Sequence, residues 1–182
     1  MVRFHFIKRL FISLILFFYS CSSYSKSFYT QYGDIGQIAI PTIACGISIF
    51  KKDWQGVKQF FQATSSTLVV VYATKYAVNA KRPLGGDYSF PSGHTAGAFS
   101  GAAYLHNRYG FINSSPAYIA AVLVGHSRVV AKAHWVRDVI GASIITIGIN
   151  HFLVSSYSKI DIGFIPKLSS KGGVITAKYK IA

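Results

Sequence analysis

Three short stretches of the chain carry residues whose types and spacing suit chemistry on an anion. The first pairs Lys75 with Arg82, which directly precedes Pro83. Their separation is about two turns of helix, so both cations can lie on one face if the helix persists to the proline. Two such cations repel each other unless an anion lies between them. Taken alone, the pair is also typical of cations that flank a membrane segment.

The second stretch is the run Pro91-Ser92-Gly93-His94, which precedes a segment of small residues that favours a helix. The N-terminus of a helix offers free N–H groups and a partial positive charge to an anion. Gly93 lets a ligand approach the backbone, Ser92 adds a hydroxyl donor, and His94 can deliver a proton near neutral pH. The same run also fits a plain N-cap at Ser92 with His94 at a membrane interface.

The third stretch contains Ser127 and Arg128, then His134, then Asp138. His134 and Asp138 have the spacing of neighbours on a helix face, so the carboxylate can hold one ring nitrogen and leave the other free to attack. This is the orienting logic of a catalytic triad, applied to a histidine nucleophile. Arg128 adds a planar fork of donors that suits phosphate oxygens. The alternative for this stretch alone is a surface His–Asp pair worth under about 1 kcal/mol.

In this order, the three stretches resemble the signature of the phosphatidic acid phosphatase type 2 and vanadium haloperoxidase superfamily. The resemblance rests on Lys-x6-Arg-Pro, Pro-Ser-Gly-His and Ser-Arg-x5-His-x3-Asp, all complete in this chain. It covers residues 75–138 directly and implies an all-α bundle in which the stretches converge on one oxyanion pocket. Three departures concern the substrate entrance rather than a catalytic position: only seven residues separate Pro83 from Pro91, which is short for many relatives, Lys132 stands where glycine is common, and Val136 stands where proline is frequent.

The resemblance implies a phosphatase that cleaves phosphate monoesters or pyrophosphates through a phosphohistidine intermediate, with no metal and no other cofactor. His134 would be the nucleophile, Asp138 its orienting carboxylate, and His94 the acid that protonates the leaving oxygen. Side-chain and backbone donors would bind the phosphate and stabilise the transition state, and these belong to Lys75, Arg82, Ser92, Gly93 and Arg128.

Alternatives to a lipid phosphatase stay open at this point. A haloperoxidase would use the same pocket, since vanadate mimics phosphate. A non-catalytic phosphate- or lipid-binding membrane protein would be expected to lack the nucleophile or the acid, and both are present. A periplasmic acid phosphatase would act on soluble esters instead of lipid phosphates. The lipid candidates are phosphatidic acid, phosphatidylglycerol phosphate, undecaprenyl pyrophosphate and lipid A.

The composition points to a membrane and to an anionic ligand. Half of the residues are apolar and only 13% are charged, about half the usual share in a soluble protein. The formal charge of +14 attracts anions. Its cations are scattered between apolar runs rather than gathered on a polar face, which argues against nucleic acid as a partner. The only carboxylates are aspartates, which disfavours a carboxylate-rich metal cage or a glycosidase acid pair.

Five apolar segments must position these stretches, and with the N-terminal run they predict five to six apolar helices. They span residues 35–50, 60–78, 95–105, 116–125 and 139–154. An untilted crossing of a bilayer takes about 20 residues, a length that only 60–78 approaches. The small residues Gly97 and Gly101 predict a close helix contact. In the tail, two runs separated by Gly172-Gly173 suggest a short β-hairpin.

The chain divides into a leader, a helical domain and a tail, at residues 1–25, 26–158 and 159–182. The leader has the order of a secretory signal peptide or a first transmembrane helix: three cations, an apolar run, then small polar residues. Cys21 stands where a lipid-modified cysteine would lie, but Phe18-Tyr19-Ser20 before it matches the required signal poorly.

Charge placement predicts an orientation. The N-terminus, the linker 51–58 and the tail are basic and fall on one side if each segment crosses once. The positive-inside tendency assigns that side to the cytoplasm. The three motif stretches would then face the periplasm or exterior of a bacterial-type inner membrane. If the leader is cleaved, the chain could instead be periplasmic.

Overall fold

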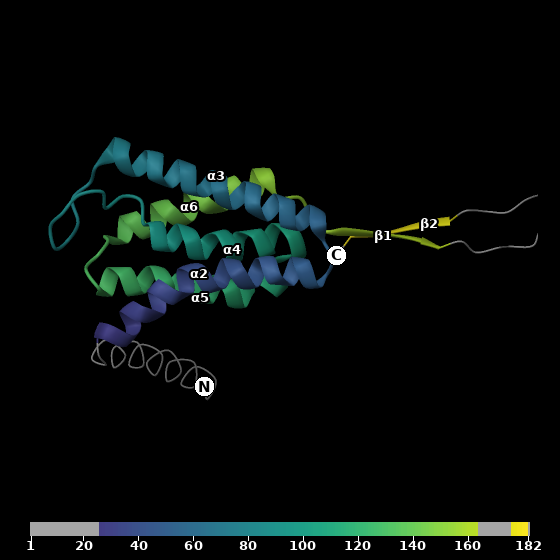
Figure 1. Cartoon of the computed structure of the whole chain (residues 1–182), viewed down its shortest axis with the longest axis horizontal. Helices are drawn as coiled ribbons and strands as arrows, with labels where there is room; N and C mark the ends of the chain where they lie inside the picture. The colour runs from purple at the N-terminus through teal and green to yellow at the C-terminus, as the bar shows by residue number, and fades with distance from the viewer. Residues whose placement is uncertain (1–25, 164–175, 182) are drawn as a thin grey trace, which may run out of the picture.

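A computed structural model describes residues 26–163 and 176–181 of the chain. The leader lies outside these residues, and with it the predictions for the signal segment and for Cys21. The described part is a bundle of five helices followed by two strands (Figure 1). These elements are α2 (Lys26–Phe50), α3 (Trp54–Val78), α4 (Gly93–Tyr109), α5 (Phe111–Val130), α6 (Val136–Leu153), β1 (Ser158–Gly163) and β2 (Thr176–Ile181).

The predicted all-α architecture is confirmed, because each of the five apolar segments forms a helix. Each helix is longer than its segment, since capping residues and polar flanks extend it. Asp53 begins α3 by accepting the N–H of Gly56 at 2.9 Å, and Ser92 caps α4. As a result α2 and α3 reach 25 residues each, so the apolar segments alone underestimated the helix lengths.

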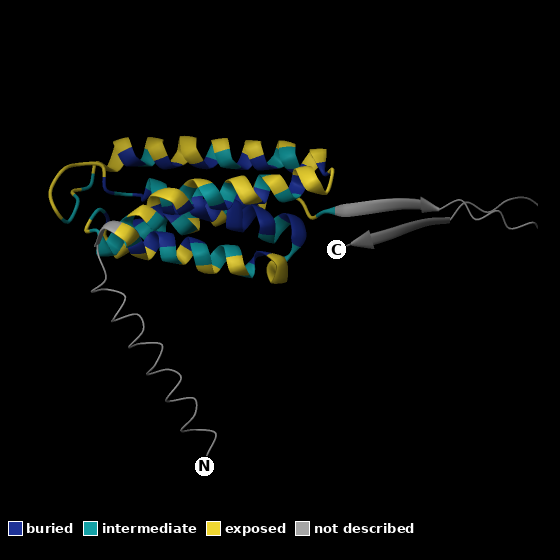
Figure 2. Cartoon of the chain, turned by 60° about the horizontal axis from the view of Figure 1, so that its bottom comes forward, coloured by how far each residue is buried: buried dark blue, intermediate teal, exposed yellow. Residues whose placement is uncertain are grey.

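Helix α4 is the centre of the bundle and contacts α2, α3, α5 and α6. Its surface is largely buried, whereas the outer helices expose their outward faces (Figure 2). A Cβ added at Gly101 would lie 2.7 Å from Cα of Pro41, and one at Gly97 would lie 3.0 Å from the Gln37 carbonyl oxygen. The predicted close contact at these two glycines is therefore confirmed, and α2 is the helix that uses it.

The end of the bundle away from the motif stretches is held by a buried ion pair. Arg108, near the end of α4, donates from Nε and Nη2 to the two oxygens of Asp53, each at 2.6 Å. Its Nη1 donates to the carbonyl oxygen of Ser155 at 2.8 Å. Gly110, with a φ of 90° that favours glycine, turns the chain from α4 directly into α5. This cluster joins the α2–α3 turn, α4 and the segment after α6.

The two strands pair antiparallel, with Ser158 opposite Ile181 and Gly163 opposite Thr176. Their antiparallel pairing is the arrangement that the two arms of the predicted β-hairpin require. Residues 164–175, which include the proposed Gly172-Gly173 turn, lie outside the described residues. The strands leave the bundle at the end where α6 finishes (Figure 1).

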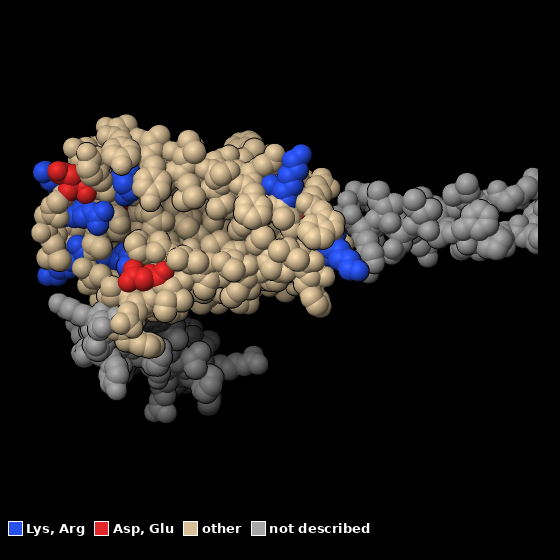
Figure 3. Space-filling view, in the orientation of Figure 1, with Lys and Arg blue, Asp and Glu red and all other residues tan. Residues whose placement is uncertain are grey.

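Each helix of the bundle has a stretch without charged side chains between its ends, and together these stretches form an uncharged belt. Figure 3 shows Lys, Arg and Asp side chains gathered toward the ends, with an uncharged band between them. Phe61, Val69 and Ile144 are among the large apolar side chains exposed in this band. Within the described residues, 28–50 and 136–153 are long and apolar enough to cross a membrane. The charge-free stretches are 35–50, 59–74, 93–107, 111–127 and 139–153.

Candidate active site

The three motif stretches meet at one end of the bundle, around the N-terminus of α4. The backbone N–H of Ser92 donates to the carbonyl oxygen of Asp138 at 3.0 Å. The indole Nε1 of Trp135 donates to the carbonyl oxygen of Lys81 at 2.9 Å. These two bonds join the loop before α4 to the beginning of α6. The structure thus brings together segments more than forty residues apart, as the resemblance implied.

Lys75 and Arg82 do not share one helix face, because the condition for it, a helix that persists to Pro83, is not met. Helix α3 ends at Val78 because Asn79 adopts a left-handed conformation with a φ of 43°, and its N–H bonds to the carbonyl oxygen of Lys75. Asparagine tolerates this conformation better than most residues. Lys75 therefore lies in the last turn of α3, whereas Arg82 is carried by the loop that follows.

Lys75 holds this loop in place. Its Nζ donates to the carbonyl oxygens of Tyr88 and Pro91, both at 2.8 Å, and the side chain is buried. Arg82 donates from Nε to the carbonyl oxygen of Asp87 at 3.1 Å. That bond does not use the two Nη groups of Arg82. The first stretch thus supplies two cations: Lys75 lies beneath the loop between α3 and α4, and Arg82 lies on that loop.

The second stretch forms a helix cap beside open space. Ser92 is fully buried, and its Oγ accepts hydrogen bonds from the backbone N–H of Thr95 at 3.4 Å and from the Thr95 hydroxyl at 3.0 Å. A Cβ added at Gly93 would meet no atom within 4 Å. The plain N-cap interpretation of Ser92 is therefore correct, and it coexists with room for an anion at the start of α4.

His134 and Asp138 are neighbours, although only Asp138 lies in a helix. His134 belongs to the loop before α6, and its Nδ1 lies 3.5 Å from Oδ2 of Asp138. The same oxygen accepts the backbone N–H of Trp135 at 2.8 Å and the Ser89 hydroxyl at 2.5 Å. Asp138 has no exposed surface. The carboxylate is thereby fixed beside Nδ1, and Nε2 is the ring nitrogen turned away from it.

The surroundings of His134 keep its imidazole neutral. Burial of the ring, followed by the charges of Lys75 and Arg82, lowers the pKa of His134 to about 4, against the opposing effect of Asp138. A neutral imidazole has the free lone pair that a nucleophile needs. Burial of the His94 ring, followed by the charge of Arg128, lowers the pKa of His94, and the charge of Arg82 acts in the same direction.

Helix α2 contributes residues that the motifs do not contain. Nη1 of Arg128 donates to Oδ1 of Asp34 at 2.6 Å, and Nε2 of His94 lies 3.0 Å from the same oxygen. Nη2 of Arg128 donates to the carbonyl oxygen of Thr30. We did not predict Asp34 or Ser89 from the sequence. For Asp34 a signal exists, because it is a lone acid in an apolar segment.

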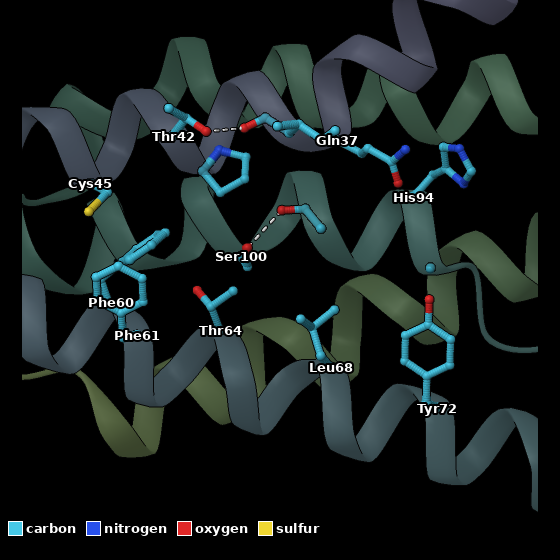
Figure 4. Close-up of a pocket in the computed structure, with 14 residues that line it drawn as sticks. Gln37, Thr42, Cys45, Phe60, Phe61, Thr64, Leu68, Tyr72, His94 and Ser100 are labelled. Atoms are coloured by element: carbon cyan, nitrogen blue, oxygen red, sulfur yellow. Dashed lines mark hydrogen bonds between the residues drawn. The ribbon is translucent and has the colours of Figure 1, made fainter.

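A groove of about 710 Å³ runs between α2, α3 and α4 to this site. Figure 4 shows Tyr72 and His94 at one end of the groove and Cys45 and Phe60 at the other. Leu68 and other apolar side chains line it along the way. The groove therefore connects the uncharged belt with the polar end of the bundle.

The all-α bundle and this site match the expected class, a helical phosphatase. Comparison with known proteins identifies the family. A model of the PAP2 superfamily matches residues 12–161, so the chain belongs to that superfamily. The chain is 31% identical to the lipid A 4′-phosphatase of Helicobacter pylori, over 90% of each chain.

Two further similarities agree with this family. The chain is 34% identical to the lipid A 1-phosphatase of Porphyromonas gingivalis over 65% of its own length, which is 29% of that longer protein. Its fold matches the crystal structure of Aquifex aeolicus LpxE with a TM-score of 0.61 and 25% identity, over 70% of this chain and 83% of that one. The chain is thus a phosphatase associated with a membrane.

Proposed function

We propose that this phosphatase removes a phosphate from the headgroup of a membrane lipid of the lipid A type. The observation that carries the proposal is the apolar groove that ends at His94, at the end of the bundle where the three motif stretches meet. A soluble ester would not need such a groove. The similarity to a lipid A 4′-phosphatase over nearly the whole chain supports the same substrate class.

The phosphate would be held at the start of α4 by charge and by backbone donors. Arg82 and Arg128 would bind its oxygens directly, and the Gly93 N–H would add a donor where the structure leaves open space. Ser92, buried in the cap, would complete the cradle, and Lys75 would add charge from beneath the loop. Such fixed donors stabilise the charge that spreads over the phosphoryl oxygens in the transition state.

The two histidines would divide the chemistry. Nε2 of His134 would attack phosphorus while Asp138 stabilises the positive charge that develops on the ring. A nitrogen–phosphorus bond forms as the bond to the leaving oxygen breaks, and that oxygen takes a proton from His94. Water, deprotonated by His94, would then release phosphate and restore His134. A metal would not be required, because the cations provide the charge.

The site would face the periplasm, within a chain of three parts. The α2–α3 turn with Lys51 and Lys52 lies at the end opposite the site, together with the strands, and this basic end would be cytoplasmic. We retain residues 1–25 as a signal or anchor, 26–158 as the catalytic helical domain and 159–182 as the tail. The match to the family model, over 12–161, includes the whole proposed helical domain and also part of the leader and of the tail.

Phosphate release from purified protein in detergent tests the proposal. We would compare lipid A, lipid A lacking either the 1- or the 4′-phosphate, and p-nitrophenyl phosphate, all with EDTA present. We expect release from lipid A in EDTA, loss of one of the two phosphates, and no turnover by His134→Ala. Turnover of the soluble ester alone would instead favour an acid phosphatase, and dependence on added metal would contradict the metal-free mechanism.

A further inference from the structure

Asp34 contacts two residues of the candidate site although it belongs to none of the three motifs. A single oxygen of its carboxylate, Oδ1, contacts both Nη1 of Arg128 and Nε2 of His94. The side chain is 51% exposed, whereas that of Arg128 is 4% exposed. The carboxylate therefore sits at the edge of the site, where it can shift without disturbing the core.

The packing of α2 is adapted to this contact. A Cβ added at Gly33 would lie 2.1 Å from the Ser127 hydroxyl oxygen and 2.2 Å from Nη2 of Arg128. Any side chain at residue 33 would thus push α2 away from the site. The Thr30 carbonyl oxygen accepts from the same guanidinium, one turn before Asp34. Thr30, Gly33 and Asp34 thus place this part of α2 directly against Arg128.

The two partners of Asp34 have different requirements during the reaction. Arg128 must donate to the substrate phosphate. The phosphate is an anion and competes with the Asp34 carboxylate for the same guanidinium N–H donors. His94 must carry a proton to the leaving oxygen, and a neighbouring carboxylate stabilises the protonated ring. A carboxylate on Nε2 also fixes the ring, so that Nδ1 remains to act as the donor.

We propose that Asp34 is the positioning residue of His94. This proposal rests on the proposed function, in which His94 is the acid that protonates the leaving oxygen. When the substrate binds, its phosphate replaces the Asp34 carboxylate as the partner of Arg128. The Asp34 carboxylate keeps its contact with Nε2 of His94. The proton on Nδ1 then passes to the leaving oxygen as the phosphorus–oxygen bond breaks. The neutral ring that results is held by Asp34 in the orientation needed to deprotonate water.

Dependence on the leaving group separates this role from a purely structural one. Nitrophenolate leaves without a proton, whereas an alkoxide needs one. We would measure kcat/KM, which reports the step that forms the phosphoenzyme, for p-nitrophenyl phosphate and for octyl phosphate in detergent. The variants are Asp34→Asn, which keeps the shape and removes the charge, and Asp34→Glu, which restores the charge. Asp87→Asn is the control, since the Asp87 side chain pairs with exposed Lys81.

We expect Asp34→Asn to lower kcat/KM on octyl phosphate by roughly 10- to 100-fold and on p-nitrophenyl phosphate by less than about 3-fold. Asp34→Glu should recover most of the loss, and Asp87→Asn should change neither value by more than about 2-fold. An equal effect of Asp34→Asn on both substrates, whether a loss, a gain or no change, would overturn the proposed role of Asp34. It would not overturn the proposed function. Wild-type phosphate release from lipid A, measured beside these two substrates, that is no higher than that of His134→Ala would overturn the proposed function as well.

Discussion

Ser89, in the loop before α4, donates a hydrogen bond of 2.5 Å to Oδ2 of Asp138. The same oxygen faces Nδ1 of His134. The serine therefore fixes the carboxylate that orients the proposed nucleophile, from a loop that itself carries Arg82.

Replacing Ser89 with alanine should lower kcat by roughly 3- to 10-fold with little change in KM, because a buried carboxylate loses a donor worth about 1 to 3 kcal/mol. Steady-state kinetics and thermal unfolding would measure both effects. Ser143→Ala is the matched control, since the Ser143 hydroxyl only donates to the Ile140 carbonyl oxygen on the exposed side of α6. A kcat equal to wild type in Ser89→Ala would show that Asp138 does not need this bond.

The acid limb of the pH profile should report the charge of Arg82. Burial, then Lys75 and Arg82, lowers the pKa of His134 to about 4, so the free enzyme keeps a neutral nucleophile well below the ordinary pKa of histidine. Arg82→Gln removes one of these positive charges, so the pKa of His134 should rise and the acid limb of kcat/KM should move to higher pH. The ionisation of the substrate is common to both enzymes and cancels in the comparison. A shift to lower pH, or none, would contradict this electrostatic role.

Stability should depend on the buried pair at the opposite end of the bundle. Arg108→Met leaves the carboxylate of Asp53 buried without its cation, which costs about 3 to 5 kcal/mol in such pairs. We expect a clear drop in the unfolding temperature in detergent. Activity per folded molecule at low temperature should stay within about 2-fold, because Arg108 is about 20 Å along α4 from His94. An unchanged unfolding temperature would mean that the pair contributes nothing to the bundle.

The helices were predictable because each one contains a long apolar stretch that only a membrane or a core can accept. The proposed catalytic residues could be named because fixed residue types recur at fixed spacings within each motif stretch. The end of α3 was not predictable. The left-handed conformation of Asn79 goes together with contacts of the following loop, such as the bond from Trp135 to the Lys81 carbonyl oxygen.

The contacts that α2 makes at the site were also beyond the sequence, although Asp34 stands out there as a lone acid. Asp34 is 60 positions from His94 and 94 from Arg128, and Ser89 is 49 positions from Asp138. No local periodicity links residues at such distances, so only the packing of α2 and of the loop against α4 reveals them. Gly33 shows the same limit, because its small size matters only where α2 meets Arg128.

The central claim is that His134 becomes covalently bound to phosphorus. Rapid alkaline quenching of the wild-type enzyme with a phosphorus-32-labelled substrate, followed by peptide mapping, tests it most directly. The account predicts an acid-labile, base-stable label on the peptide that contains His134, and no label on the His134→Ala protein. A wild-type enzyme that turns over without this label, or a label that persists in His134→Ala, would contradict it.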